Sequence, residues 1–174
     1  MNKDKFCILP FIHLSTRTNG AMQLCCHANS STTKDYRQPG LNRKSDGDFV
    51  YVNEDKPSDY WNTDYMKSVR KKLMNNEMPR ECMICYKEEA SGYRSKRQWE
   101  NDEWSEKVDF DDVLAKVKDD GEAPFDIRYV DMKLGNKCDL ACLMCNPADS
   151  SLWIPDYNKL IDSNISEKAK EELL

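Results

Sequence analysis

The chain has 174 residues, of which 33% are charged, and its formal net charge is −5. No apolar run approaches the roughly 20 residues that a membrane-spanning helix requires, which argues against a membrane protein. The acidic balance gives no indication of nucleic-acid binding, and we expect a cytoplasmic protein. Because cytosolic thiols stay reduced, the eight cysteines are interpreted as metal ligands rather than as four disulfides.

The first predicted element is a β-hairpin over residues 12–25. Apolar residues alternate on both sides of Asn19-Gly20, which is the strongest short-range signal for a tight primed turn. This turn would fold Cys25 back beside Cys7. Neighbouring strand residues point to opposite faces, so Cys25 and Cys26 cannot both share a site with Cys7.

Helices are predicted to follow a polar loop over 28–59. We expect one helix near 63–76, a second from about Pro79 to Trp104, and a third over 109–119 that Gly121 and Pro124 end. The second would carry Cys82 and Cys85 near its start, as a pair that can offer two thiolates to one metal. Its basic run at 94–97 is typical of a solvated helix face, and a packing stripe is predicted from Tyr86, Ala90, Tyr93, Trp99 and Trp104.

A predicted strand over 127–134 leads to a third cysteine group. Cys138, Cys142 and Cys145 follow the pattern C-x3-C-x2-C, which offers three thiolates from one loop and no fourth. An iron–sulfur cube held in this way keeps one iron open to a small molecule, whereas four cysteines close the cluster. Beyond this loop, Ser166 is a candidate N-cap of a last helix, with Ile165, Ala169 and Leu173 at helical spacing.

The third cysteine group, with residues 130–137 before it and 146–151 after it, resembles the signature loop of radical S-adenosylmethionine (SAM) enzymes. The resemblance implies that Cys138, Cys142 and Cys145 hold a [4Fe-4S] cluster. The free iron of such a cluster chelates the amino and carboxylate groups of SAM, and one electron then releases a 5′-deoxyadenosyl radical. Met144 stands where the family commonly has an aromatic residue near the adenine, and it is therefore the candidate cofactor contact.

The first two cysteine groups are similar to the auxiliary-cluster modules of the twitch and SPASM type. The shared pattern is C-x12-G-x4-C on a hairpin, then a helix, then C-x2-C. It implies a second [4Fe-4S] cluster, whose ligands are Cys7, Cys25, Cys82 and Cys85. Cys25 is assigned by its spacing from Gly20, and Cys26 replaces it if the hairpin register shifts by one. In most relatives the auxiliary module follows the catalytic barrel, whereas here it comes first.

These resemblances imply an α+β auxiliary module over 1–105, built from the hairpin and helices. A helical linker over 106–125 and the first βα unit of a partial (β/α) barrel over 126–174 would follow it. Only 29 residues come after Cys145, and a six-unit barrel needs on the order of 190 residues, so we expect the N-terminal portion of an enzyme.

The expected activity is reductive cleavage of SAM to modify a substrate, such as a peptide, with electrons from a flavodoxin or ferredoxin. Two alternatives stay open. One is a standalone two-cluster electron-transfer protein. The other is a binding domain that a zinc ion stabilises by binding Cys7, Cys25, Cys82 and Cys85, because zinc accepts the same ligands as the cluster.

Overall fold

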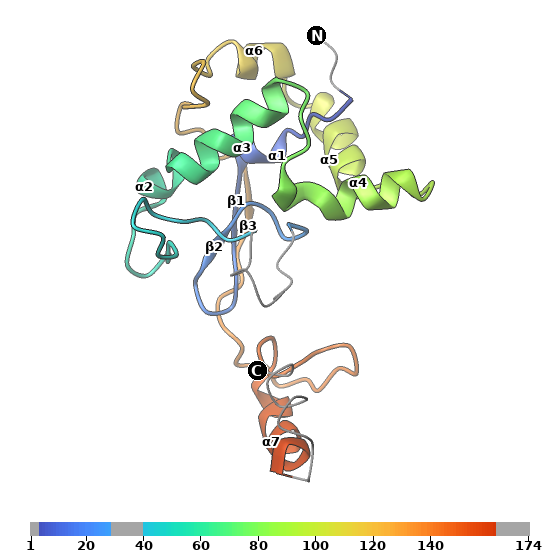
Figure 1. Ribbon diagram of the computed structural model, residues 1–174. Coiled ribbons are helices and arrows are strands. Elements are labelled where there is room, and N and C mark those ends of the chain that lie inside the picture. Colours follow the sequence, from blue (N-terminus) through green and yellow to red (C-terminus); the bar gives the residue numbers. More distant parts are fainter. Residues whose placement is uncertain (1–3, 29–39, 163–174) are drawn as a thin grey trace.

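A computed structural model describes residues 4–28 and 40–162 of the chain. A small sheet lies at the centre, helices α1 to α6 gather around one end of it, and α7 lies beyond the other end (Figure 1). The helices are α1 (Leu9–Ile12), α2 (Pro57–Trp61), α3 (Asp64–Met74), α4 (Met83–Ala90), α5 (Lys96–Ser105), α6 (Phe110–Leu114) and α7 (Ile154–Asp162), with 3-10 turns η1 (Arg80–Cys82) and η2 (Ser151–Trp153). The strands are β1 (His13–Thr16), β2 (Met22–Gln23) and β3 (Tyr129–Asp131).

The sheet is mixed, with the strand order β2-β1-β3. β1 pairs with β2 in antiparallel register, Ser15 opposite Gln23, and with β3 in parallel register, His13 opposite Tyr129. The hairpin predicted over 12–25 is therefore confirmed. The strand predicted over 127–134 forms only from Tyr129 to Asp131, and it joins the sheet of the hairpin rather than starting a sheet of its own.

The turn of the hairpin differs from the primed turn that we predicted. The amide of Gly20 donates to the carbonyl of Arg17 at 2.9 Å, and Gly20 alone in the turn has a positive φ, of 84°. A primed turn of type I′ needs positive φ at both central residues. The structure instead has an ordinary turn closed by a left-handed glycine, the usual geometry of a three-residue hairpin loop. Within this loop the side chain of Asn19 accepts from the amide of Ala21 at 3.1 Å.

Helix α3 (Asp64–Met74) confirms the helix that was predicted near 63–76. Thr63 caps the start, since its side chain accepts from the amide of Met66. Asn76 closes the end in the left-handed conformation, with a φ of 58°, and the amide of Glu77 returns to the carbonyl of Lys72. Val69 and Leu73 face the core, which also contains Phe11, Ile12, Tyr60, Trp61 and Met66.

The single helix predicted from Pro79 to Trp104 is wrong. The chain forms η1 and α4, turns at Gly92 with a φ of 82°, and begins α5 after Ser95. Ser95 and Gln98 form a reciprocal capping box, which defines a new helix start. The predicted packing stripe is confirmed only for Tyr86, which is buried, and Trp104, which packs against the core, whereas Tyr93 is 72% and Trp99 58% exposed.

The remaining elements are shorter than predicted or lie elsewhere. The helix expected over 109–119 is regular only from Phe110 to Leu114, and α2 begins inside the expected loop. The helix expected after Ser166 lies outside the described residues. Within the part of the chain that the structure describes, no helix is long and apolar enough to cross a membrane.

Candidate metal centre

Four cysteine thiols gather where the N-terminal segment, the hairpin and the start of α4 meet. Burial raises the pKa of the Cys7 thiol to about 12, and the nearby Cys85 adds to this rise. Burial also raises the pKa of Cys25 and Cys82, and in both cases the charge of Cys7 contributes. The four thiols therefore share one environment, in which several buried thiolates are stable only if a cation compensates their charge.

Backbone amides point at three of these four sulfurs. The amides of Leu9 and His27 donate to Cys7 and Cys25, and each lowers the pKa of its thiol against the larger effect of burial. The amide of Arg97 does the same for Cys85. Donors that face sulfur stabilise thiolates and tune the potential of a cluster that those thiolates hold.

The four sulfurs are not gathered tightly enough for three of them to share one ion as they stand. A tetrahedral zinc ion with Zn–S bonds of about 2.3 Å brings its sulfurs within about 4 Å of one another. In residues 4–28 and 40–162, no three of the four thiols lie within 4.8 Å of one another.

Cys26 faces a different environment from Cys25. Burial raises the pKa of Cys26, and the neighbouring carboxylate of Asp131 on β3 raises it further. Its other charged neighbours are Lys96 and Glu100 on α5. Cys25 has Cys7 and Cys85 as neighbours instead. The geometry thus favours Cys25 in the group of four.

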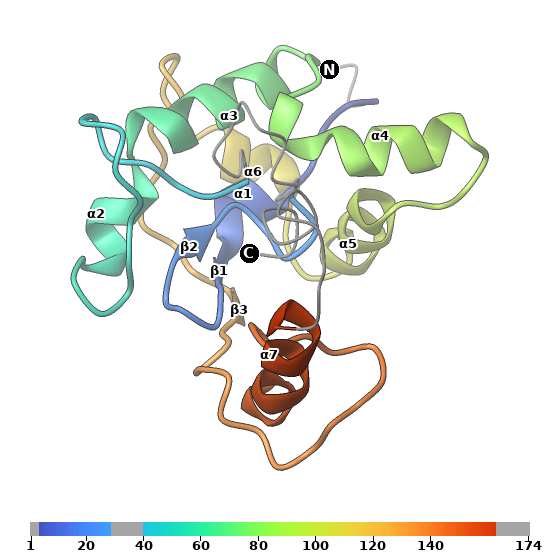
Figure 2. The same ribbon diagram turned by 60° about the horizontal axis from the view of Figure 1, so that its bottom comes forward.

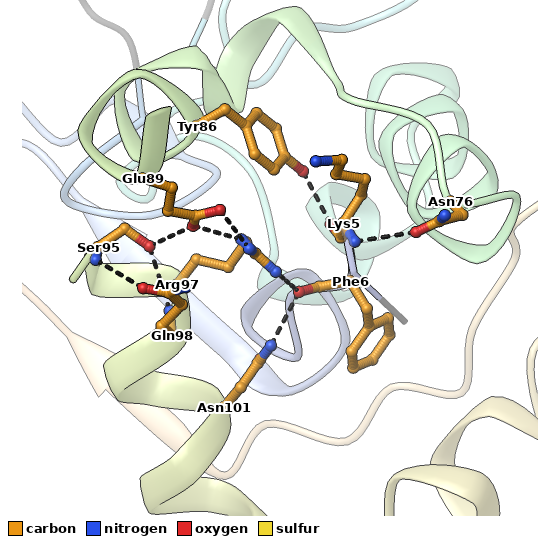
Figure 3. A network of polar contacts seen from close by, with 9 residues as sticks. All are labelled: Lys5, Phe6, Asn76, Tyr86, Glu89, Ser95, Arg97, Gln98 and Asn101. Atoms are coloured by element: carbon orange, nitrogen blue, oxygen red, sulfur yellow. Dashed lines mark hydrogen bonds and ion pairs between the residues drawn. The ribbon is translucent and has the colours of Figure 1, made fainter. Parts of the chain in front are cut away.

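A polar network on α4 and α5 fixes the segment that carries Cys7 (Figure 3). The guanidinium of Arg97 forms an ion pair with Glu89 at 2.5 Å and donates to the carbonyl of Phe6 at 2.8 Å. Asn101 also donates to Phe6, and it accepts from the amide of Ile8 at 2.9 Å. Both peptide groups that flank Cys7 are held in this way.

Sequence reasoning missed this network, because the run at 94–97 was interpreted as a solvated helix face. Arg97 is only 6% exposed, so that interpretation is wrong for this residue. The signal that could have identified it is the capping box of Ser95 and Gln98, since that box fixes which face of α5 turns inward.

A second, tighter set of metal-ligating groups shares one residue with the four thiols. His27, Cys85 and Glu88 place one ligand atom each within 4.8 Å of the other two. Nε2 of His27 lies 3.0 Å from Oε1 of Glu88. Sequence reasoning left His27 out, and the C-x2-C pair gave no indication that Glu88, one helical turn after Cys85, would face it.

The three remaining cysteines lie in the loop between β3 and η2. The amide of Cys145 donates to the carbonyl of Cys142 at 2.9 Å, which turns the loop back on itself. Partial desolvation raises the pKa of Cys145, and Cys142 and Cys138 both add to the rise, so the three thiols are neighbours. Cys142 is exposed, unlike the buried Cys7 and Cys85.

Two hydrogen bonds from residues that follow the cysteine loop hold its backbone in place, while the side chains at its tip are exposed. Nε1 of Trp153 donates to the carbonyl of Cys142 at 3.0 Å, and Oγ of Ser150 donates to Leu140 at 2.8 Å. The tip residues Leu143 and Met144 are 96% and 94% exposed. Met144, the candidate cofactor contact, therefore points away from the body of the protein.

Comparison with protein-family models, curated proteins and solved structures finds no significant match for this chain. Its two cysteine groups therefore have to be interpreted from their own chemistry. One offers four thiols, two buried and two partly buried, and backbone amides face three of them. The other offers three thiols on an accessible loop, a donor set that suits a cluster with one iron left for an outside ligand.

Proposed function

We propose that this chain carries radical SAM chemistry on two iron–sulfur clusters. Cys138, Cys142 and Cys145 would hold the cluster with an open iron. An auxiliary cluster would have four ligands, Cys7, Cys25, Cys82 and Cys85. The observation that carries the proposal is the contrast between three neighbouring thiols on a loop with an exposed tip and four thiols of which two are buried and two partly buried.

The chemistry that such an open cluster supplies is one-electron reduction of SAM to a 5′-deoxyadenosyl radical. The chain's own part is to hold the three thiols on a loop that Trp153 and Ser150 fix from behind. The exposed tip leaves the outer side of the loop free for SAM and for the substrate. The auxiliary group would relay electrons or anchor the substrate.

The partners follow from this chemistry. A small reductant protein, a flavodoxin or a ferredoxin, would deliver the electron. A peptide is the substrate class that the resemblance to twitch and SPASM proteins favours. Radicals of this kind need protection from oxygen, which agrees with a reducing compartment.

The decisive experiment is anaerobic reconstitution of the chain with iron and sulfide. We expect the broad visible absorption of [4Fe-4S] clusters and a paramagnetic signal after reduction. Added SAM should alter the part of this signal that comes from the Cys138 loop, and Cys142→Ala should abolish that change while leaving the other signal intact. A chain that binds no iron, or whose reduced signal ignores SAM, would contradict the proposal, and the second result would favour a two-cluster electron carrier.

A zinc site is the second candidate, because one observation favours it specifically. The compact set of His27, Cys85 and Glu88 has the mixed donors and the short spacing of a mononuclear site. In that case Cys85 would bind zinc and leave the group of four. Metal analysis of the chain purified without oxygen distinguishes the two sites. If the chain contains one zinc and His27→Ala loses it, the zinc site is supported. If the chain contains iron and His27→Ala retains it, the cluster is supported.

A further inference from the structure

Arg17 is the one arginine in the described chain whose side chain has no partner. Seven arginines lie in that part of the sequence. The other six are Arg43, Arg70, Arg80, Arg94, Arg97 and Arg128, and each has at least one polar or ring contact. Nε of Arg17 is buried without a hydrogen-bond partner. Arg17 as a whole is half-buried, so it is this one N–H that loses hydration without compensation, which is costly unless a ligand supplies the partner.

Arg17 lines a cavity between the hairpin turn and the segment around the cysteine loop. The cavity measures about 370 Å³, and its other lining residues are Thr18, Asn19, Asn136 and Ala148. No carboxylate lines it. Two asparagine amides and one cation therefore surround a space large enough for a small ligand.

Hydrogen bonds between residues more than 100 positions apart in the sequence join the walls of this cavity. Oγ1 of Thr18 donates to the carbonyl of Ala148 at 2.8 Å, and the amide of Lys133 donates to Oγ1 of Thr16 at 3.1 Å. On the far wall, Asn136 donates to the carbonyl of Pro147 at 3.0 Å. The cavity is thus fixed by the same contacts that join the hairpin to the cysteine loop (Figure 2 shows both regions).

The carboxylate next to this wall is engaged elsewhere. Asp149 follows Ala148 in sequence, but its carboxylate pairs with Lys133 at 3.1 Å and accepts from Asn146 at 3.2 Å. Arg17 is consequently left with a net positive charge that faces neutral polar walls.

We propose that this cavity binds an oxyanion, the carboxylate or phosphate group of a small ligand, through the guanidinium of Arg17. A guanidinium presents a planar fork of donors that matches both groups, and the amides of Asn19 and Asn136 offer further donors beside it. The site is distinct from both cysteine groups and does not depend on which metal they bind. Its position beside the cysteine loop would place the anionic end of a ligand at the edge of that loop.

The test is a titration of the full chain, purified without oxygen, with two probes at constant ionic strength. Inorganic phosphate and N-acetylglycine carry the two oxyanions, and N-acetylglycinamide is the neutral control. We expect saturable shifts of the Arg17 Nε–H and Asn136 amide resonances with an oxyanion and none with the neutral probe. Saturation by phosphate alone, by N-acetylglycine alone, or by both identifies the preferred group and supports the site.

Matched variants separate binding from folding. Arg17→Gln should weaken binding at least tenfold, and Arg94→Gln, which removes the same charge from the exposed surface of the α4–α5 turn, should not change it. Asn19→Asp keeps the side-chain acceptor for Ala21 but adds a negative charge to the wall, so it should also weaken binding without unfolding the turn. Binding that persists in Arg17→Gln, or no saturable shift with either oxyanion in the unmodified chain, would overturn the proposal.

Discussion

Arg97 joins two cysteines that are 78 residues apart by contacting both sides of their site. Its guanidinium donates to the carbonyl of Phe6, next to Cys7, at 2.8 Å. Its backbone amide faces the sulfur of Cys85 and lowers the pKa of that thiol, against the larger effect of burial. One residue on α5 thus contacts both the segment that precedes the hairpin and the C-x2-C turn. Figure 3 shows the first of these contacts, between Arg97 and Phe6.

Replacing Arg97 by Met should destabilise the fold strongly. The change leaves the carboxylate of Glu89, which is 16% exposed, without its main partner, and breaking a buried ion pair in this way costs about 3 kcal/mol. Urea denaturation of the variant and of the unmodified chain measures the difference. The control is Arg94→Met, which removes an exposed ion pair with Asp102 and should cost less than about 1 kcal/mol. Equal losses in the two variants would show that the buried pair has no special role.

His13 should make the stability of the fold depend on pH. Burial lowers the pKa of this fully buried ring from 6.5 to about 4, and the charges of Asp131 and Glu100 offset only part of the shift. The nearby backbone of Leu24 also raises the pKa slightly, but neither ring nitrogen of His13 has a hydrogen-bond partner. The unfolded chain therefore takes up a proton below pH 6.5, whereas the folded chain does so only near pH 4.

Since the unfolded state binds this proton first, the free energy of unfolding should fall as the pH drops from 6.5 towards 4. Between pH 6.5 and pH 5 the loss is about 1.6 kcal/mol. Denaturation curves at these two pH values measure it. His13→Phe keeps an aromatic ring against Tyr129 but cannot titrate, so its stability should change much less over the same interval. A variant as sensitive to pH as the unmodified chain would contradict the assignment to His13.

Cys25 and Cys26 are neighbours in sequence and should behave differently on iron loading. Cys25→Ala removes a thiol from the group of four, so reconstituted protein should lose about half of its iron and the corresponding absorption. Cys26→Ala removes a thiol that faces the carboxylate of Asp131 instead of the other thiols, so the iron content should stay unchanged. Iron analysis with visible absorption decides between them. The opposite pattern would mean that the hairpin register differs by one residue.

Gly121→Ala should be far more damaging than Gly92→Ala, although both glycines have positive φ. A Cβ at Gly121 would lie 2.1 Å from the backbone carbonyl oxygen of Lys67, whereas nothing lies within 4 Å of one at Gly92. The left-handed conformation alone costs about 1 kcal/mol for alanine. The clash with α3 should add at least about 2 kcal/mol at Gly121, because backbone must move. Thermal unfolding of the two variants tests this, and similar melting temperatures would disprove the close packing at Gly121.

Local signals in the sequence predicted several elements well. The alternation around Asn19-Gly20 predicted the hairpin, and Tyr65, Val69 and Leu73 at helical spacing predicted α3, because both patterns act within a few residues. The prediction failed between Pro79 and Trp104. There Gly92 and the capping box of Ser95 outweighed the helical propensity of the flanking residues.

The sequence by itself determined that eight cysteines fall into local groups and that a hairpin could bring Cys25 back towards Cys7. Only the tertiary structure decided that Cys25 turns to the other thiols while Cys26 turns to Asp131, that β3 lies parallel to β1, and that Arg97 is buried. The physical reason is that these outcomes depend on which faces of distant elements pack together. A spacing pattern fixes the face of one strand or helix, but the partner of that face is set by burial and by hydrogen bonds between segments far apart in the chain.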